Sequence, residues 1–212
     1  MKTPYAFADE QLSELKKYVS AEFHNAANVM SFDEVNIQSA KKLTKQLYAE
    51  LIAQNEKVFN RIGKRCYKDA LKETGKYDDD FWFSTAIILA LLSRYHPVTQ
   101  YQYNNEATRK RDRFTEVLLS APDAQTMRAA FNDAAKRWFE QSRQYADFSV
   151  AEARTNAFKD AKIQRVKWMA EHDEKTCDEC KALDGRIFDI DAVPEIPMHR
   201  HCRCWLEPVL DS

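Results

Sequence analysis

Four of the five cysteines and two of the five histidines lie between residues 177 and 204. The first pair, Cys177 and Cys180, has C-x2-C spacing, and after eighteen residues a second group follows with His199, His201, Cys202 and Cys204. Thiolate and imidazole are soft to borderline ligands, and two close groups joined by a loop can complete a tetrahedral sphere around Zn²⁺. Such a sphere leaves no open position, so the pattern predicts a structural metal.

Two disulfides, or unliganded redox-active thiols, are the alternatives to a metal. The N-terminus reads Met1-Lys-Thr-Pro-Tyr5 and lacks the charged, apolar and small-residue regions of a signal peptide. We therefore expect the thiols to stay reduced, which favours metal binding. A bridge between Cys202 and Cys204 would also be strained. The sequence thus predicts one Zn²⁺ per chain.

The second group offers more donors than a tetrahedral site needs. His199 and Cys202 repeat the x2 spacing and are the first choice of closing pair. Cys204 is the rival, either in place of Cys202 or beside it in an all-cysteine site that releases His199. His201 is disfavoured because it is adjacent to Cys202. The predicted ligands are four of the five residues Cys177, Cys180, His199, Cys202 and Cys204.

The composition is that of a mainly helical protein. The chain has only three glycines, 31% charged residues and a formal net charge of −1. Apolar periodicity predicts a helix over residues 9–29, and a Ser31–Glu34 capping box predicts a second helix that runs to about residue 62. Further helices are expected at 81–92 (buried and central), 122–145 and 149–171. These helices would form an elongated or bundled body.

The C-terminal part is expected to be a small zinc-stabilised module. Asp184-Gly185 is a turn signal, and Ile187 and Phe188 suit a short strand, so a short β-hairpin is predicted there. A unit of this size buries too little apolar surface to be stable without the metal. The predicted division is a helical body over 1–147, followed by a capping helix and the zinc module over 148–212.

The densest basic run of the chain contains Arg109, Lys110, Arg111 and Arg113. A short run of this kind is commonly a solvated helix face, and the sharper interpretation is a contact with DNA phosphates or an acidic partner. The predicted 149–171 helix would expose a second basic surface, made of Arg154, Lys159, Lys162, Arg165 and Lys167. The near-neutral net charge by itself predicts neither nucleic-acid binding nor membrane attraction.

Catalysis finds little support in the sequence. No G-x-S-x-G, Walker loop, dinucleotide-binding fingerprint or H-E-x-x-H is present. Cys66 has no histidine nearby in sequence, and His172 stands too close to Cys177 for a zinc deaminase. We expect the protein not to be an enzyme.

The Cys/His segment resembles the C-terminal motif of the phage Mu F-like minor head proteins, also called phage head morphogenesis proteins. That family pattern is D-x-x-x-C-x-x-C-x-x-L-(D/N)-G, then a loop, then P-x-H-P-x-C-R-C. Here it reads Asp173-Glu-Lys-Thr-Cys-Asp-Glu-Cys-Lys-Ala-Leu-Asp-Gly185 and Pro197-Met-His-Arg-His-Cys-Arg-Cys204, preceded by Trp168. Residues 153–157 are similar to the family's A-R-T-E-A segment, with Asn156 in place of glutamate and, further on, Arg200 in place of proline. The resemblance covers roughly residues 148–209.

The resemblance implies a minor capsid or head-morphogenesis protein of a tailed bacteriophage. Such a protein would be assembled in the host cytoplasm and carried in the virion at the portal vertex, in several copies. Its expected partners are the portal protein, the major capsid protein and packaged DNA, with no membrane. It would aid head assembly or DNA delivery. A zinc-containing DNA-binding or regulatory protein is the alternative, and a metal-dependent nuclease that uses His199 is a further one.

Overall fold

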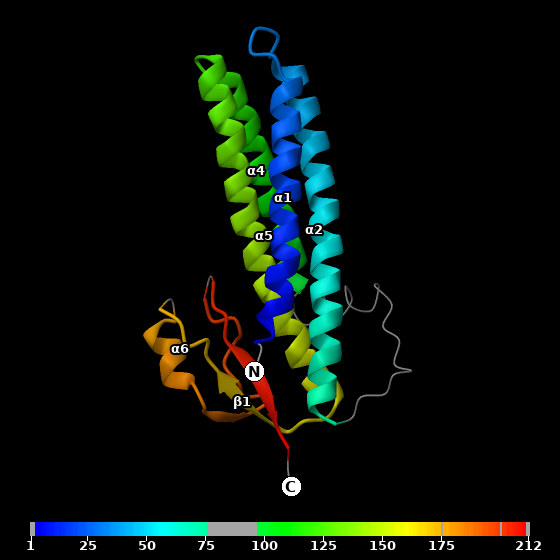
Figure 1. Cartoon of the computed structure of the whole chain (residues 1–212), viewed down its shortest axis with the longest axis vertical. Helices are drawn as coiled ribbons and strands as arrows, with labels where there is room; N and C mark the ends of the chain where they lie inside the picture. The colour runs from blue at the N-terminus through cyan, green and yellow to red at the C-terminus, as the bar shows by residue number, and fades with distance from the viewer. Residues whose placement is uncertain (1–2, 76–96, 175, 200, 211–212) are drawn as a thin grey trace. The chain divides into compact units, whose positions relative to one another are not determined.

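The computed structural model of the chain describes residues 3–75, 97–174, 176–199 and 201–210, with side chains of 97–102 excepted. It is mainly helical, as the composition predicted (Figure 1). The helix predicted at 81–92 lies outside the described residues. Within these described ranges the helices are α1 (Tyr5–Val29), α2 (Ile37–Glu73), α4 (Pro97–Ser120), α5 (Ala124–Asp160) and α6 (Asp178–Leu183). The strands there are β1 (Arg165–Met169), β2 (Ile187–Asp189) and β3 (Trp205–Val209).

The chain divides into two compact units. The first, here the sheet unit, contains Met1–Gln11, Phe59–Pro97 and Gln144–Ser212. The second, here the helix unit, contains Leu12–Val58 and Val98–Arg143. The predicted division into a helical body over 1–147 and a C-terminal part over 148–212 stays a prediction. Within the described ranges, no helix combines the length and apolar character that a membrane span requires.

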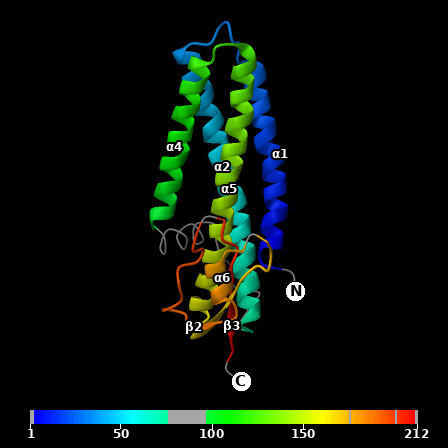
Figure 2. The same cartoon turned by 90° about the vertical axis from the view of Figure 1, so that its left-hand side faces the viewer.

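The helix unit is an arrangement of four helical segments that alternate in direction along the chain (Figures 1 and 2). Aromatic rings fill its core. The Phe114 ring lies 5.8 Å from that of Phe23 and 5.0 Å from that of Phe131, both in edge-on geometry. The Tyr48 ring meets the Trp138 ring at 5.2 Å. Edge-on pairs of this kind add to the stabilisation that area burial already provides.

Buried polar side chains in the helix unit pair with each other across helices. The hydroxyls of Thr44 and Thr115 are 2.7 Å apart. The Asn55 amide donates to the Tyr103 hydroxyl at 2.9 Å and to the Ser142 hydroxyl at 2.8 Å. A one-turn slip of any helix would leave these groups buried without partners, so the pairs fix the register of the packing.

Polar side chains cap the starts of α2 and α5. The Asn36 carboxamide oxygen accepts from the backbone N–H of Gln38 and Ser39, so α2 begins at Ile37. The Ser31–Glu34 capping box was therefore wrong, because the cap lies further along. Before α5, the Asp123 carboxylate accepts from the Thr126 N–H at 2.7 Å, and this bond lowers the pKa of Asp123.

The prediction of a separate helix over residues 149–171 is wrong at both of its ends. It is the last part of α5, which ends at Asp160 in a Schellman motif. The Ile163 N–H donates to the Phe158 carbonyl and the Lys162 N–H to the Lys159 carbonyl, with Lys162 at φ 59°. After this turn the chain is extended. Residues 165–169 form a strand in which buried and outward-facing positions alternate.

The sheet unit contains a three-stranded antiparallel sheet in the order β2-β1-β3. In its register, Val166 of β1 faces Phe188 of β2 on one side and Pro208 of β3 on the other. The strand predicted at Ile187 and Phe188 is confirmed, but it pairs with β1 rather than forming a tight hairpin. In the chain, α6 separates β1 from β2, and it is drawn next to β1 in Figure 1.

Candidate metal centre

The first pair of candidate ligands is built by the start of a short helix. Cys177 is the N-cap of α6, with φ −71° and ψ 162°, and its sulfur accepts from the Cys180 backbone N–H at 3.3 Å. This geometry places the two thiols one helical turn apart on the same side. The Cys180 side chain is buried, and that of Cys177 is half-buried.

The second group sits on a turn directly before β3. The Cys202 N–H donates to the His199 carbonyl at 3.1 Å, and His201 has a left-handed φ of 63°. The turn brings His199 and Cys202 to one side and leaves the His201 side chain exposed. Cys204 is buried and immediately precedes the first residue of β3, Trp205.

The structure gathers all five predicted residues into two overlapping triads. Cys177, Cys180 and His199 form one, and Cys180, Cys202 and Cys204 form the other, with the donor atoms of each triad within 4.8 Å of one another. His199 Nε2 lies 3.1 Å from Cys177 Sγ and 3.3 Å from Cys180 Sγ. Cys180 belongs to both triads, so it is the centre of the cluster.

The donor set fits a tetrahedral zinc ion. With Zn–S bonds of about 2.3 Å, two sulfur ligands of one tetrahedron stand about 3.8 Å apart. The separation of Cys180 Sγ and Cys202 Sγ is 3.7 Å. Thiols and imidazole are the donors that Zn²⁺ prefers, and among the described residues no carboxylate belongs to the cluster. The cluster could therefore hold a metal ion of this kind.

The electrostatics of the thiols favour a bound cation. Burial raises the pKa of the Cys180 thiol to about 12. The hydrogen bond with Cys202, together with burial, raises the pKa of Cys204 as well. Cys177 and Cys202 are the opposite case. The Cys180 N–H stabilises the Cys177 thiolate and lowers its pKa. The Cys204 side chain stabilises the Cys202 thiolate by a hydrogen bond and lowers its pKa. Adjacent buried thiols cannot all ionise without compensation, and a divalent cation supplies that compensation.

The loop after α6 is tied to β1 by backbone hydrogen bonds. The Gly185 N–H donates to the Trp168 carbonyl at 2.8 Å, and the Asp184 carboxylate accepts from the Ala170 N–H at 2.8 Å. Gly185 has φ 75°, and an added Cβ would meet only Lys167 Cε at 3.9 Å. The glycine is therefore required by the backbone conformation, not by lack of space.

The first turns of α1 hold the turn that carries Cys202 and Cys204. The buried Tyr5 hydroxyl donates to the Cys204 carbonyl at 2.8 Å, and the Arg203 guanidinium stacks over the Tyr5 ring at 4.6 Å. Arg203 also forms ion pairs with Asp9 at 2.8 Å and with Glu171 at 3.2 Å. Burial raises the pKa of Tyr5, so its hydroxyl keeps the proton that it donates. Tyr5 and Arg203 thus fix the backbone between two candidate ligands.

Replacing Tyr5 with phenylalanine is expected to speed metal loss without unfolding the chain. The change removes the hydrogen bond to the Cys204 carbonyl and keeps the ring under Arg203. Outer-shell partners of metal ligands are worth roughly tenfold or more in metal affinity. The measurement is the rate of zinc transfer to a chromogenic chelator.

Tyr67→Phe is the matched control for Tyr5→Phe. Its hydroxyl donates to Asp160 Oδ2 at 2.8 Å and touches no candidate ligand. Both variants lose a phenolic hydroxyl that donates a hydrogen bond, so a difference between them isolates the effect on the turn that carries Cys202 and Cys204. Equal zinc-release rates in the two variants would contradict the role given to Tyr5.

The residues of the basic run on α4 have different environments. Arg111 pairs with its neighbour Asp112 at 2.8 Å, and the Lys110 ammonium donates to the Arg137 carbonyl at 3.4 Å. Arg113 lines a pocket, and Arg109 is exposed. The four residues therefore do not form one uniform basic stripe. Their predicted contact with DNA or a partner stays a prediction.

The prediction that Arg154 belongs to an exposed basic surface is wrong. The Arg154 side chain is only 3% exposed, and it binds both Glu73 carboxylate oxygens at 2.9 and 2.6 Å. Its guanidinium also donates to the Leu206 carbonyl at 2.7 Å. Arg154 therefore stabilises the interior of the sheet unit, where it joins α5 to α2 and β3.

Comparison with known proteins finds a family model that matches the C-terminal part of the chain. Residues 124–207 match the family model described as Phage Mu protein F like protein. The match confirms the resemblance found in the sequence, and it spans α5, β1, α6, β2 and all five candidate ligands. It covers less than half of the chain. No curated protein and no solved structure gives a significant match.

Proposed function

We propose that this protein is a structural head-morphogenesis protein, a minor capsid protein of a tailed phage, located at the portal vertex. The observation that carries the proposal is that the family match and the Cys/His cluster occupy the same stretch of the chain. The stretch that matches the phage Mu protein F-like family is also the stretch that gathers Cys177, Cys180, His199, Cys202 and Cys204 into one cluster. The chemistry that this stretch supports is structural metal binding.

We further propose that four of these five residues hold one Zn²⁺. Cys180 is in every set, because it belongs to both triads. Cys177, His199 and Cys202 complete the first choice, and Cys204 is the rival for the last position. The ion would cross-link α6 to the turn before β3, two segments that lie 22 residues apart at Cys180 and Cys202. Metal binding would then supply folding free energy to this end of the sheet unit.

A structural role agrees with the donor set. With four or five protein donors available, the ion would have no coordination position left for a substrate. Catalytic zinc sites, in contrast, keep one coordination position open. The proposed partners are the portal protein and the major capsid protein, with packaged DNA as a further contact. The protein would act in head assembly or in DNA delivery and would perform no chemistry of its own.

The head-protein proposal predicts that the chain is a component of purified virions. Quantitative mass spectrometry of purified heads should detect it in a few copies per portal, and chemical cross-linking should join it to the portal protein. The major tail protein in the same particles serves as a negative control for cross-linking. Absence of the chain from heads, with free chain in the lysate, would refute the proposal.

A zinc-containing DNA-binding or regulatory protein is the second candidate. The run Arg109, Lys110, Arg111 and Arg113 on α4 favours it, since clustered cations attract phosphates. Salt-dependent DNA binding by the isolated protein, without any portal, would support this alternative over the first. A nuclease would need hydrolysis that is lost on replacing His199 while the fold survives.

A further inference from the structure

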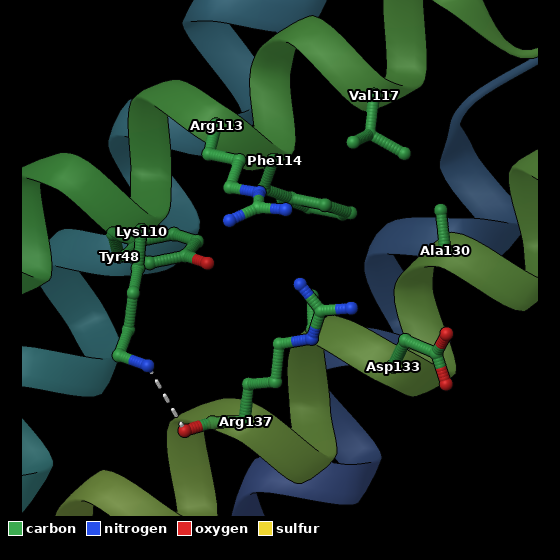
Figure 3. A pocket seen from close by; sticks show the side chains of 9 residues that line it. Tyr48, Lys110, Arg113, Phe114, Val117, Ala130, Asp133 and Arg137 are labelled. Atoms are coloured by element: carbon green, nitrogen blue, oxygen red, sulfur yellow. Dashed lines mark hydrogen bonds between the residues drawn. The ribbon is translucent and has the colours of Figure 1, made fainter.

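A small pocket lies among α2, α4 and α5 in the helix unit. It has a volume of about 100 Å³. Its base consists of the buried aromatic rings of Tyr48 and Phe114, and small apolar side chains form part of its walls. Figure 3 shows the basic residues at its mouth: Lys110 and Arg113 from α4, and Arg137 from α5.

Two guanidinium groups point into this pocket from opposite helices. Arg113 and Arg137 face the same hollow (Figure 3), and in the described part of the chain neither guanidinium forms an ion pair. The Lys110 ammonium is held beside them by the Arg137 carbonyl at 3.4 Å. The Asp133 carboxylate, the one acid of the lining, is directed away from both guanidinium groups (Figure 3). Like charges repel, so an anion between the two guanidinium groups would be stabilised.

A buried phenol adds a third donor to the same space. Tyr48 is only 3% exposed, and its hydroxyl points into the pocket (Figure 3). Among the residues that the structure describes, this hydroxyl has no hydrogen-bond partner. Burial raises the pKa of Tyr48, so the hydroxyl keeps its proton and can donate. The hydroxyl oxygen is not among the buried polar atoms that lack a partner, so it is accessible from the pocket and can donate to a ligand that enters it.

These donors define the chemistry of the ligand. Two guanidinium groups and one hydroxyl match an oxyanion, because guanidinium groups bind carboxylates and phosphates through paired hydrogen bonds. The limited volume and the apolar walls at Val117 and Ala134 suit a carboxylate on a short methylene stem. A DNA backbone would instead need cations spread along a path, and here Arg111 is already paired with Asp112.

We propose that this pocket binds a glutamate or aspartate side chain from an acidic, apolar-flanked segment of a partner protein. Arg113 and Arg137 hold the carboxylate, and Tyr48 donates the third hydrogen bond. The apolar neighbours of the acidic residue pack on the walls of the pocket. Binding at this pocket is independent of a role in the phage head, because it can be measured on the isolated chain without portal protein or heads.

The test uses the full-length, zinc-loaded chain and a fluorescein-labelled peptide of alternating leucine and glutamate. Fluorescence anisotropy should show saturable binding, which the same peptide with glutamine in place of glutamate should lose. The Arg113→Gln/Arg137→Gln double variant is expected to weaken binding by about tenfold or more, and Tyr48→Phe by about threefold to tenfold. Circular dichroism would confirm that each variant is folded.

The matched control is Arg109→Gln/Arg111→Gln, which removes the same number of charges from α4 alone and leaves the pocket lining intact. This control should keep most of the peptide affinity. An equal loss in the control would reduce the effect to general electrostatics and overturn the pocket. Lack of saturable peptide binding up to about 1 mM would also overturn it. The proposal would also be overturned if a short DNA duplex bound through Arg113 and Arg137 and the peptide did not bind.

Discussion

Replacing Cys180 with serine is expected to abolish metal binding and to loosen the chain after about residue 171. Cys180 is the one residue common to both triads, so its loss disrupts every ligand set. Zinc affinity should fall by more than about a hundredfold, the upper range for loss of an outer-shell partner alone. Most of the far-UV helix signal should remain, because α1, α2, α4 and α5 contain none of the five candidate ligands. Mass spectrometry of metal content and hydrogen exchange are the measurements.

Cys66→Ala is the control for the cysteine replacement. Cys66 is buried, lies outside the cluster, and donates weakly to the Pro4 carbonyl at 3.8 Å. This variant should retain about one zinc per chain. Wholesale loss of helix signal in Cys180→Ser would contradict the separable role given to the metal segment. A full zinc content in that variant would contradict the ligand assignment itself.

Thiol counting before and after chelation identifies the closing ligands. In the wild-type protein, four thiols that become reactive on chelation would show closure by Cys177, Cys180, Cys202 and Cys204 alone. Three would show that His199 completes the site. Zinc affinity should also fall as the pH falls, because protons compete with the metal for thiolate and imidazole. The raised pKa of Cys180, about 12, means that this thiol must release a proton when the metal binds.

The Cys/His cluster was predictable from the sequence, because the residues that can share a metal are recognised by residue type and short spacing. The C-x2-C pair and the later group converge in the structure as the spacing indicated. The choice among five donors was not predictable, because it depends on angles within a turn where His201 adopts φ 63°. Sequence spacing states which residues can meet, and the backbone decides how they are oriented.

The end of α5 could not be placed because its stop signal is not the usual residue. Helices that end in a Schellman motif commonly carry glycine at the left-handed position, and here Lys162 takes it. The strand that follows did leave a signal. Val166 and Trp168 are both buried, and the charged residues between and before them face outward, which is a period of two. The helical interpretation of this segment overlooked that alternation.

Long-range contacts of single side chains left no trace in local sequence. Tyr5 reaches the Cys204 carbonyl across 199 residues, and Arg154 reaches Glu73 across 81. Neither residue stands out in its helix from the local sequence. Arg154 in particular would be expected to face solvent, as basic residues on helices commonly do. Only the tertiary fold shows that Arg154 is interior.

Replacing Arg154 with methionine is expected to destabilise the sheet unit by about 3 kcal/mol. Methionine keeps much of the buried volume but leaves the Leu206 carbonyl without its donor and the Glu73 carboxylate without its partner. Removing one member of a buried ion pair costs roughly 3–5 kcal/mol of stability. The lower value is expected here because the Glu73 side chain is 38% exposed, so water solvates part of its charge. Urea unfolding of the zinc-loaded protein, followed by circular dichroism, measures the free energy of unfolding.

Arg65→Met is the matched comparison for Arg154→Met, because Arg65 also belongs to the sheet unit and pairs with a carboxylate, Asp69, at 2.6 Å. The two side chains of that pair are 57% and 39% exposed, so its loss should cost less than about 1 kcal/mol. Adding Glu73→Gln to Arg154→Met should recover part of the lost stability, since the carboxylate no longer stands without a partner. Equal costs for the two single variants would show that burial of Arg154 does not determine its contribution. A small cost for Arg65 beside a large one for Arg154 would establish that the guanidinium joining α5, α2 and β3 is a principal interior contact of this unit.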